Sequence, residues 1–413
     1  MGQTIVDTPR IAVFQSHWAL QSHTILLVHH LAENGFPVDL FTIDCPEFYP
    51  LDDLRKLSNV RVIDCSDALS KDKASTKDSA VMRIVNTIKH DLKQIYGLLG
   101  LDLSSEDVTI LTENDRKKIE SFTGTTSYEW FIGVEKEGFL LAAQYALQQG
   151  KPYLYYSLEL YTRAHPLVKT SPRWQTIHKL ESKYLKTARA VVIQDQNRAD
   201  VFLKDYGLPP VDLIFIPISL EPSFYRLTNK SIYTENEFDL IQLGVISKQR
   251  YTFDLVDVFH RLMPNRRLLI HGYGEQKDIQ KLQTMTHSDQ VTLSLDKVDA
   301  HDLPLVIGRA KVGLALYAPT PVNDRLTIKS SEKIPLYLMC GKPVITFDYE
   351  GCELLDNYHC GATIHSFADL PAAFDKIIQN YAEYSQNALR CFDQVYRYEK
   401  NAHMLVEYLK DAG

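Results

Sequence analysis

Short apolar runs alternate with longer stretches of helical periodicity along most of the chain. The first repeat consists of an apolar run over 11–14, a helical stretch over 20–34, Gly35, and a second apolar run over 38–43. Apolar residues that recur three or four positions apart indicate an amphipathic helix, and a short apolar run bounded by turn residues indicates a buried strand. Gly35 occupies the position at which a glycine commonly ends a helix. The alternation therefore predicts parallel sheets built from βαβ units.

The alternation forms two series, separated by a polar stretch over 220–237 that is rich in turn residues. Further strands of the first series are predicted at 60–63, 130–134, 153–156, 190–193 and 213–216. Strands of the second series are predicted at 240–245, 267–270, 291–295, 312–316, 343–347 and 362–364. Each series predicts one doubly wound α/β domain. Ligands of such sheets bind beyond the carboxyl ends of the strands, so two such domains that face each other would enclose a ligand-binding cleft.

The break between the two series predicts the domain boundary near residue 230. A Rossmann-like N-terminal domain is expected over 1–230 and a Rossmann-like C-terminal domain over 231–386. Residues 66–121 are charged and less regular, and we interpret them as an insertion over the face of the first domain. The last stretch, 387–413, has a helical pattern and is predicted to pack back on the first domain.

Composition narrows the class of protein. Of 413 residues, 45% are hydrophobic and 23% are charged, which is the balance of a globular protein with sizeable cores. The net charge of −7 lacks the basic excess that drives nucleic-acid binding. The six cysteines form no C-x-x-C pair, which favours reduced thiols over a zinc site or disulfides. Neither a signal peptide nor an apolar run of roughly 20 residues is found. We expect a cytoplasmic protein, with peripheral contact to the inner face of a membrane as an open alternative.

The segment 330–345 is the strongest candidate for chemistry. Its helical part begins with Ser330, Ser331 and Lys333 and ends at Gly341, and a buried strand follows. The first turn of a helix offers unpaired backbone N–H groups and the positive end of the helix dipole, and both attract anions. The residues alone leave two interpretations open, a diphosphate site or a capped helix with a solvated lysine.

Residues 331–345 read SEKIPLYLMCGKPVI and resemble the S-x-K…YLA-x-GKPVI segment of glycosyltransferases similar to family 4. In that family this helix holds the nucleotide and diphosphate of the sugar donor. The resemblance extends more weakly over most of the chain. It implies a GT-B fold, in which two Rossmann-like domains face a central cleft, and sugar transfer with retention of anomeric configuration. UDP-linked donors, the commonest in the family, are expected on the resemblance alone.

The loop after the first strand of the second series also resembles the family. The segment from Gly244 to Arg250 is similar to a G-R-x-x-x-x-K loop, in which two basic side chains hold the donor phosphates. Here Val245 replaces the first basic residue, Arg250 provides the second, and Lys248 lies between them. The resemblance therefore assigns the donor phosphates to Arg250, together with Lys333, and leaves Lys248 as a substitute for the lost cation.

Two more stretches of the second series are candidates for donor contacts. Gly272-Tyr273-Gly274 resembles the family's strand followed by a G-x-G turn. Tyr317, Asn323, Arg325 and Lys329 lie in the loop that precedes the donor helix. We expect these side chains to lie near the sugar or the diphosphate, with exposed loop residues as the alternative.

The sequence departs from the family at one conspicuous point. Many members carry two glutamates in an E-x7-E pattern just before the G-x-PV segment. Counting back from Gly341, these positions hold Leu336 and Ile328, and the nearest carboxylate is Glu332. The glutamate that usually binds the donor ribose is therefore missing or has moved.

Three residues of the N-terminal half are candidates for the acceptor side. Each of Glu159, Glu135 and His17 follows a predicted strand. In the family, a His or Asp after the strand equivalent to 153–156 lies close to the sugar, which makes Glu159 the first candidate. A carboxylate there could orient the acceptor hydroxyl or stabilise positive charge at the anomeric carbon. The alternative for all three is a surface residue in a loop.

A glycosyltransferase that needs neither a metal ion nor a cofactor is the predicted function. Negative charge grows on the leaving nucleoside diphosphate, and the chain lacks a convincing D-x-D element for a metal, so Lys333, Arg250 and Glu159 are the predicted catalytic residues. The acceptor, whether a glycan, a lipid-linked intermediate or another hydroxyl compound, is not identified, nor is the oligomeric state. Two alternatives stay open: an inactive GT-B scaffold that partners another glycosyltransferase, and a nucleotide-sugar epimerase.

Overall fold

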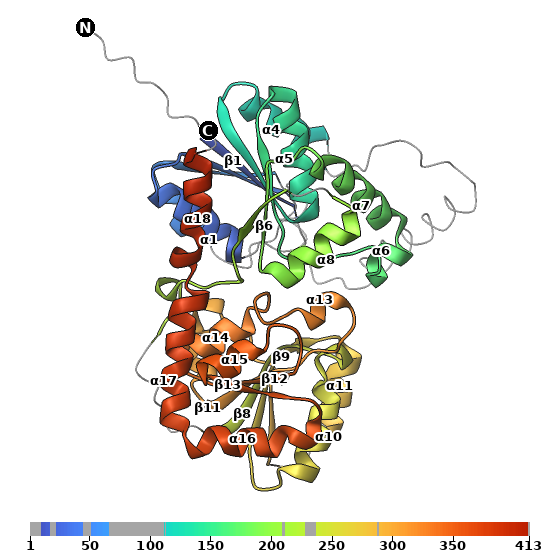
Figure 1. Cartoon of the computed structure of the whole chain (residues 1–413), viewed down its shortest axis with the longest axis vertical. Coiled ribbons are helices and arrows are strands. Elements are labelled where there is room, and N and C mark those ends of the chain that lie inside the picture. The colour runs from blue at the N-terminus through green and yellow to red at the C-terminus, as the bar shows by residue number, and fades with distance from the viewer. Residues whose placement is uncertain are drawn as a thin grey trace, which may run out of the picture.

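The computed structural model describes residues 10–16, 22–43, 51–65, 111, 113–208, 211–227, 237–286 and 289–411. These residues form two lobes, and each lobe is built on a parallel sheet covered by helices (Figure 1). The N-terminal lobe is the upper one in Figure 1, and the C-terminal lobe lies below it. The predicted fold class, two doubly wound α/β domains, is confirmed.

The first sheet has the strand order β3-β2-β1-β4-β5-β6-β7. Its strands are β1 (Arg10–Ser16), β2 (Val38–Ile43), β3 (Val60–Asp64), β4 (Tyr128–Val134), β5 (Tyr153–Tyr156), β6 (Ala190–Ile193) and β7 (Asp212–Phe215). The helices of this lobe are α1 (Ser22–Glu33), α2 (Asp52–Arg55), α4 (Glu113–Thr123), α5 (Glu135–Gln149), α6 (Pro166–Thr170), α7 (Pro172–Leu185) and α8 (Gln196–Tyr206). The order reverses between β1 and β4, and ligands bind at such a switch point in open parallel sheets.

The second sheet has the strand order β10-β9-β8-β11-β12-β13, and its switch point lies between β8 and β11. Its strands are β8 (Phe238–Ile246), β9 (Leu268–Gly274), β10 (Val291–Ser294), β11 (Ala310–Ala315), β12 (Val344–Phe347) and β13 (Gly361–Ile364). Its helices are α10 (Thr252–Leu262), α11 (Gln276–Met285), α12 (Leu303–Ile307), α13 (Val322–Arg325), α14 (Lys333–Met339), α15 (Glu353–Tyr358) and α16 (Leu370–Gln379). Two more helices follow, α17 (Tyr381–Cys391) and α18 (Tyr398–Asp411).

Helix α14 is packed directly on this switch point. A Cβ at Gly313 in β11 would lie 2.4 Å from the ring of Tyr337, so only a glycine allows the helix to approach this strand. The Tyr337 hydroxyl in turn accepts a hydrogen bond from the Leu243 N–H of β8 at 3.0 Å. A strand with both faces covered by helices is mainly apolar, as is β12, whose four residues are all buried although Thr346 is polar. The start of α14 is thereby held beside the ends of β8 and β11.

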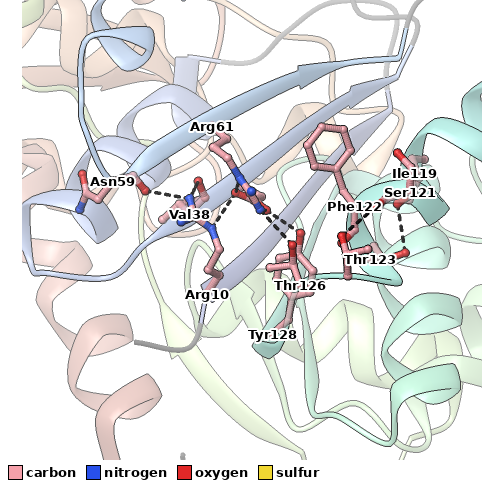
Figure 2. Close-up of polar contacts among 12 residues, drawn as sticks. Arg10, Val38, Asn59, Arg61, Ile119, Ser121, Phe122, Thr123, Thr126 and Tyr128 are labelled. Carbon is pink, nitrogen blue, oxygen red and sulfur yellow. Dashed lines mark hydrogen bonds and ion pairs between the residues drawn. The ribbon is translucent and has the colours of Figure 1, made fainter. Parts of the chain in front are cut away.

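A buried carboxylate connects neighbouring strands of the first sheet at the end away from the switch-point ligand site. Asp39, on β2, accepts hydrogen bonds from Arg10 Nε at 2.8 Å, Arg61 Nε at 2.7 Å and the Tyr128 hydroxyl at 2.5 Å. Figure 2 shows Arg10, Arg61 and Tyr128 converging on this point, with Thr126 beside them. A fully buried charge is stable only when it is paired in this way. These residues lie near the amino ends of the strands, away from the ligand-binding edge, so the cluster connects four strands and is not part of the candidate site.

The two lobes are joined by a crossing of two chain segments. Leu220, in the linker, donates its N–H to Tyr396 O at 2.9 Å, and Tyr398 N donates back to Leu220 O at 3.0 Å. Beyond this crossing, α18 packs on the N-terminal lobe, where Leu405 and Leu409 join its core (Figure 1). The helical pattern from 387 is therefore broken: α17 packs on α14 of the second lobe, a π-helical turn follows, and only α18 reaches the first lobe.

Some predicted features lie outside the described residues. His17 is among them, and so is most of the insertion predicted over 66–121, of which α4 is the described part. Within the described part, no helix is both long and apolar enough to cross a membrane. The five described cysteines, which are Cys65, Cys340, Cys352, Cys360 and Cys391, are buried free thiols.

Candidate functional site

Two cationic side chains of the second lobe lie over the same buried aromatic ring. Lys333 Nζ is 5.1 Å from the ring centroid of Tyr317, and the guanidinium carbon of Arg250 is 4.5 Å from it. Lys333 begins α14, Arg250 ends the 3₁₀ turn that follows β8, and Tyr317 follows β11. The structure thus brings these three predicted donor residues together at the switch point, where a parallel sheet binds its ligand.

Lys333 is the unpaired member of this cation pair. Arg250 forms an ion pair with Asp324 at 3.0 Å, whereas no described residue forms a hydrogen bond or an ion pair with Lys333 Nζ. Burial, and then the neighbouring Arg250, lower the pKa of Lys333 to about 7. An anion bound here would favour the charged lysine and supply the partner that it lacks. The site is therefore suited to a phosphate group.

Gly244 and Gly272 keep the strand ends beside Lys333 free of side chains. A Cβ at Gly244, where φ is +95°, would lie 2.8 Å from Lys333 Cε. Gly272 is paired with Gly244 across the sheet, and its Cβ would lie 1.8 Å from Gly244 O. The prediction of a G-x-G turn is wrong, because β9 continues through Gly274, whose Cβ would lie 2.7 Å from Ile246 O. These glycines permit close approach of β8 and β9 and do not turn the chain.

The start of α14, the predicted donor helix, also differs from the prediction. α14 begins at Lys333, so Ser330 and Ser331 lie before it. Both serines donate their N–H groups to Thr327 O, at 3.0 and 2.8 Å, and the Ser331 hydroxyl bonds to the Tyr317 hydroxyl. Because these amides are used within the loop, the two serines support the cation pair and do not offer free backbone donors to an anion.

On the opposite lobe, Glu135 is the first residue of α5 and directly follows β4 at the N-terminal switch point. Its φ of 59° is uncommon for a residue other than glycine. A Cβ at Gly133 would lie 2.2 Å from Phe139 Cα, so α5 is pressed against its own strand and the junction between them is tight. The buried Glu135 carboxylate accepts the N–H groups of Leu158 and Glu159 through Oε1, at 2.7 and 2.9 Å.

The two candidate carboxylates are therefore neighbours with different roles. Burial, and then Glu159, raise the pKa of Glu135 to about 8, which favours the neutral form of Glu135. Burial also raises the pKa of Glu159, while Arg198 and, further down the order of effects, Arg250 counteract this rise. Glu135 shapes the segment that follows β5. Glu159 belongs to that segment, and it lies close enough to the second lobe for the charge of Arg250 to lower its pKa.

Sequence analysis missed Arg198, which has an exposed fraction of only 1%. It lies on α8 of the first lobe and donates to Leu158 O at 2.9 Å. It also donates to three acceptors of the second lobe, which are Asn323 Oδ1, Leu326 O and Ser330 Oγ. An arginine on an amphipathic helix usually lies in solvent, and no local pattern distinguishes this one.

The remaining candidates are less closely connected to the cation pair. Lys248 is exposed, and Tyr273, at the end of β9, has an exposed fraction of 58%. Arg325 forms an ion pair with Glu350 at 3.1 Å, within the second lobe. Within the part of the chain that the structure describes, no group of three or more His, Cys, Asp or Glu residues has the spacing of a metal site.

Neither protein-family models nor curated protein sequences match this chain. Solved structures do. Sucrose-phosphate synthase from Thermosynechococcus elongatus is 14% identical, with 98% of this chain and 99% of that chain covered and a TM-score of 0.65. Anabaena HepE in complex with UDP and glucose is 13% identical, with 97% and 99% covered and a TM-score of 0.66.

A third structure, described as trehalose-6-phosphate from E. coli bound with UDP-2-fluoro glucose, is 11% identical, with 97% and 99% covered and a TM-score of 0.58. At such identities a likeness shows the fold and not the activity. The similarity nevertheless covers both lobes and nearly the full length of each chain. Together with the two parallel sheets and their facing switch points, it establishes that this chain has the two-domain GT-B fold.

Proposed function

We propose that this protein is a glycosyltransferase that uses a nucleoside diphosphate sugar, with UDP as the nucleotide. The observation that carries the proposal is the cation pair, Lys333 and Arg250, at the switch point of the second lobe, with Lys333 lacking an anionic partner among the described residues. The GT-B fold supports it, as do the structural neighbours described as complexes with UDP or a UDP-sugar.

In this proposal the cation pair stabilises the leaving group. As the bond between the sugar and the diphosphate breaks, negative charge develops on the bridging and terminal phosphate oxygens. Lys333 and Arg250 would bind those oxygens, and fixed cations in a partly buried site stabilise such charge more than water does. This arrangement needs no metal ion. Retention of anomeric configuration is part of the proposal and rests on the resemblance to family 4.

Glu159 would serve the acceptor in this proposal. It projects from the segment after β5 and hydrogen-bonds Asn323 of the second lobe at 2.8 Å, so it lies where the two lobes meet. A carboxylate there could orient the acceptor hydroxyl toward the anomeric carbon. The acceptor is proposed to be a glycan, a lipid-linked intermediate or another hydroxyl compound.

One observation favours an inactive GT-B scaffold as the second candidate. Leu336 and Ile328, at the positions where the family often carries glutamates, are 4% and 1% exposed and belong to the hydrophobic core. The usual ribose contact cannot be made from these positions. An inactive scaffold would bind no nucleotide tightly, which separates the two candidates.

Thermal unfolding with nucleotides tests the proposal. A ligand present at 100 times its dissociation constant should raise the free energy of unfolding by about 2.7 kcal/mol. We expect a clear increase in Tm with UDP and smaller ones with GDP, ADP and TDP. Unchanged unfolding with all four nucleotides would favour the inactive scaffold.

Replacing Gly244 by alanine should weaken UDP binding without unfolding the protein. The new Cβ would contact Lys333 Cε and push the ammonium group out of position, which we expect to cost about tenfold in affinity, or about 1.4 kcal/mol. Gly35→Ala is the matched control, because Gly35 has a similar φ of +88° but nothing within 4 Å. Calorimetric titration should show the loss in G244A alone, whereas equal affinities in both variants would separate Gly244 from the nucleotide site.

UDP binding should be coupled to proton uptake above neutral pH. The pKa of about 7 means that free Lys333 is mostly neutral at pH 8, whereas a bound diphosphate favours its charged form. We expect UDP affinity to fall by up to about fivefold between pH 7 and pH 8. Titration calorimetry at pH 8 in two buffers of different ionisation enthalpy measures the uptake directly. Lys333→Arg should abolish it, because arginine stays charged, and equal heats in the two buffers for the wild type would contradict this expectation.

A further inference from the structure

The loop between β11 and α14 is bonded to the first lobe by a partly buried hydrogen-bond network around Asn323. Its side-chain Oδ1 accepts the Leu160 N–H at 2.9 Å and an Arg198 N–H at 3.1 Å. Its Nδ2 donates to Glu159 Oε2 at 2.8 Å. Only this orientation of the amide satisfies all three partners, because two donors face one end and a carboxylate faces the other. α13, which carries Asn323, lies on the side of the second lobe that faces the first (Figure 1).

Arg198 completes the network from the first lobe. Its guanidinium group donates to Leu326 O at 3.2 Å and to the Ser330 hydroxyl at 2.9 Å, both in the loop that leads to Lys333. The same group donates to Leu158 O at 2.9 Å. One buried side chain therefore joins the segment that carries Glu159 to the loop that leads to the donor helix. Burying an arginine is costly unless its N–H groups are bonded, so the network forms fully only when the lobes are together.

The segment over 158–160 is consequently held from two sides. Within its own lobe, Glu135 accepts the N–H groups of Leu158 and Glu159. From the second lobe, Asn323 accepts the Leu160 N–H and donates to the Glu159 carboxylate. If the lobes separated, the contacts with Glu135 would persist, but the Glu159 side chain would lose the partner that fixes its orientation.

We propose that Arg198 and Asn323 are positioning residues, which fix the Glu159 carboxylate against the donor loop when the two lobes close. This inference rests on the proposed function, in which Glu159 serves the acceptor. The inference adds that the donor side and the acceptor side are coupled, because the loop that carries the proposed donor contacts also fixes the orientation of the Glu159 carboxylate. Neither Arg198 nor Asn323 needs to touch the donor for this role.

The test compares Asn323→Asp, Glu159→Gln, the double variant and Arg198→Lys at pH 8. The aspartate of N323D would keep the acceptor for Leu160 and Arg198 but place a second carboxylate against Glu159. In the double variant, the glutamine of E159Q would donate to the aspartate of N323D and restore the hydrogen bond with its direction reversed. Arg226→Ala is the control, because Arg226 forms an exposed ion pair with Asp302 at 2.8 Å and belongs to the linker.

Three measurements are made on each variant: the radius of gyration by small-angle scattering, UDP affinity, and UDP release from UDP-glucose in water. We expect N323D and R198K to be more open than the wild type and the double variant to regain the closed form. UDP affinity should stay within about threefold of the wild type in every variant. Release should fall by about 10²-fold in N323D, E159Q and the double variant, because each disturbs or removes the carboxylate.

The double variant tests whether the network serves to position the Glu159 carboxylate or only holds the two lobes together. A closed double variant with wild-type UDP release would show that the network only holds the lobes together, and would overturn the inference. The inference would also be overturned if N323D and R198K had the radius of gyration and the rate of UDP release of the wild type. If the wild type itself neither binds UDP nor releases it, the proposed function fails, and with it the role of Glu159. Scattering of N323D then decides whether the network closes the lobes.

Discussion

Replacing Lys333 by alanine should lower the turnover of the nucleotide sugar by about 10²–10³-fold, or about 2.7–4 kcal/mol of barrier, the scale of losing one fixed donor to a developing anion. The reason is local. Lys333 and Arg250 lie over one ring, and only Arg250 has a carboxylate partner in the described protein. The removed charge is therefore the one left free for the diphosphate. UDP release from the preferred UDP-sugar, measured with and without acceptor, gives the rate.

Two further substitutions distinguish the effect of losing the Lys333 charge from the effect of unfolding the protein. Lys333→Met keeps the length of the side chain and removes a charge that is partly buried beside Arg250, so this variant should be at least as stable as the wild type yet as slow as K333A. Lys333→Arg keeps the charge and should retain part of the rate. A well-folded K333M protein with near-wild-type turnover would remove Lys333 from the mechanism.

Lowering the pH from 7 to 4 should destabilise the protein by about 3 kcal/mol through His23 alone. His23, on α1, is 3% exposed, and its Nε2 accepts the Ser219 N–H of the linker at 2.8 Å. Burial lowers its pKa from 6.5 to about 4. The unfolded chain therefore binds a proton near pH 6.5, whereas the native protein does so only near pH 4. Between these two pH values proton binding favours the unfolded chain, so the free energy of unfolding falls. Below about pH 4 the contribution of neutral His23 to stability is fully lost.

The matched variant is His23→Gln, whose side-chain amide oxygen can accept the same N–H but does not titrate. Urea unfolding at pH 7, 6, 5 and 4 should show a steeper loss of stability in the wild type than in H23Q, because carboxylates and other histidines contribute equally to both. Parallel pH curves for the two proteins would mean that His23 is not kept neutral at the junction of the lobes.

The order of elements could be predicted from the sequence because each strand and helix carries its own periodicity. Three of the four residues of β12 are apolar, and α14 ends at Met339, shortly before Gly341, where a positive φ favours glycine. The start of α14 and Arg250 could be singled out for the same reason, since their signals are local. Lys333 and Arg250 are 83 residues apart, taken from their numbers, yet both lie at the strand ends where the switch-point rule places ligands.

Features set by tertiary contacts could not be predicted in this way. The pattern from 387 onward is helical without interruption, and only the pairing of Leu220 with the segment around Arg397 breaks it. The glycines of β9 resemble a turn, although they serve the approach of β8. Arg198 has no local signal, and Asn323 could be predicted only as a loop residue near the donor, because the contacts of both depend on partners from the other lobe.

The central claim is that a nucleoside diphosphate binds to the cation pair of the second lobe. A crystal structure of the wild-type protein soaked or grown with UDP tests it most directly. We expect the diphosphate within hydrogen-bond distance of Lys333 Nζ and the Arg250 guanidinium group, beside the bare backbone of Gly244. UDP bound elsewhere, or a diphosphate that leaves Lys333 without a partner, would contradict the account.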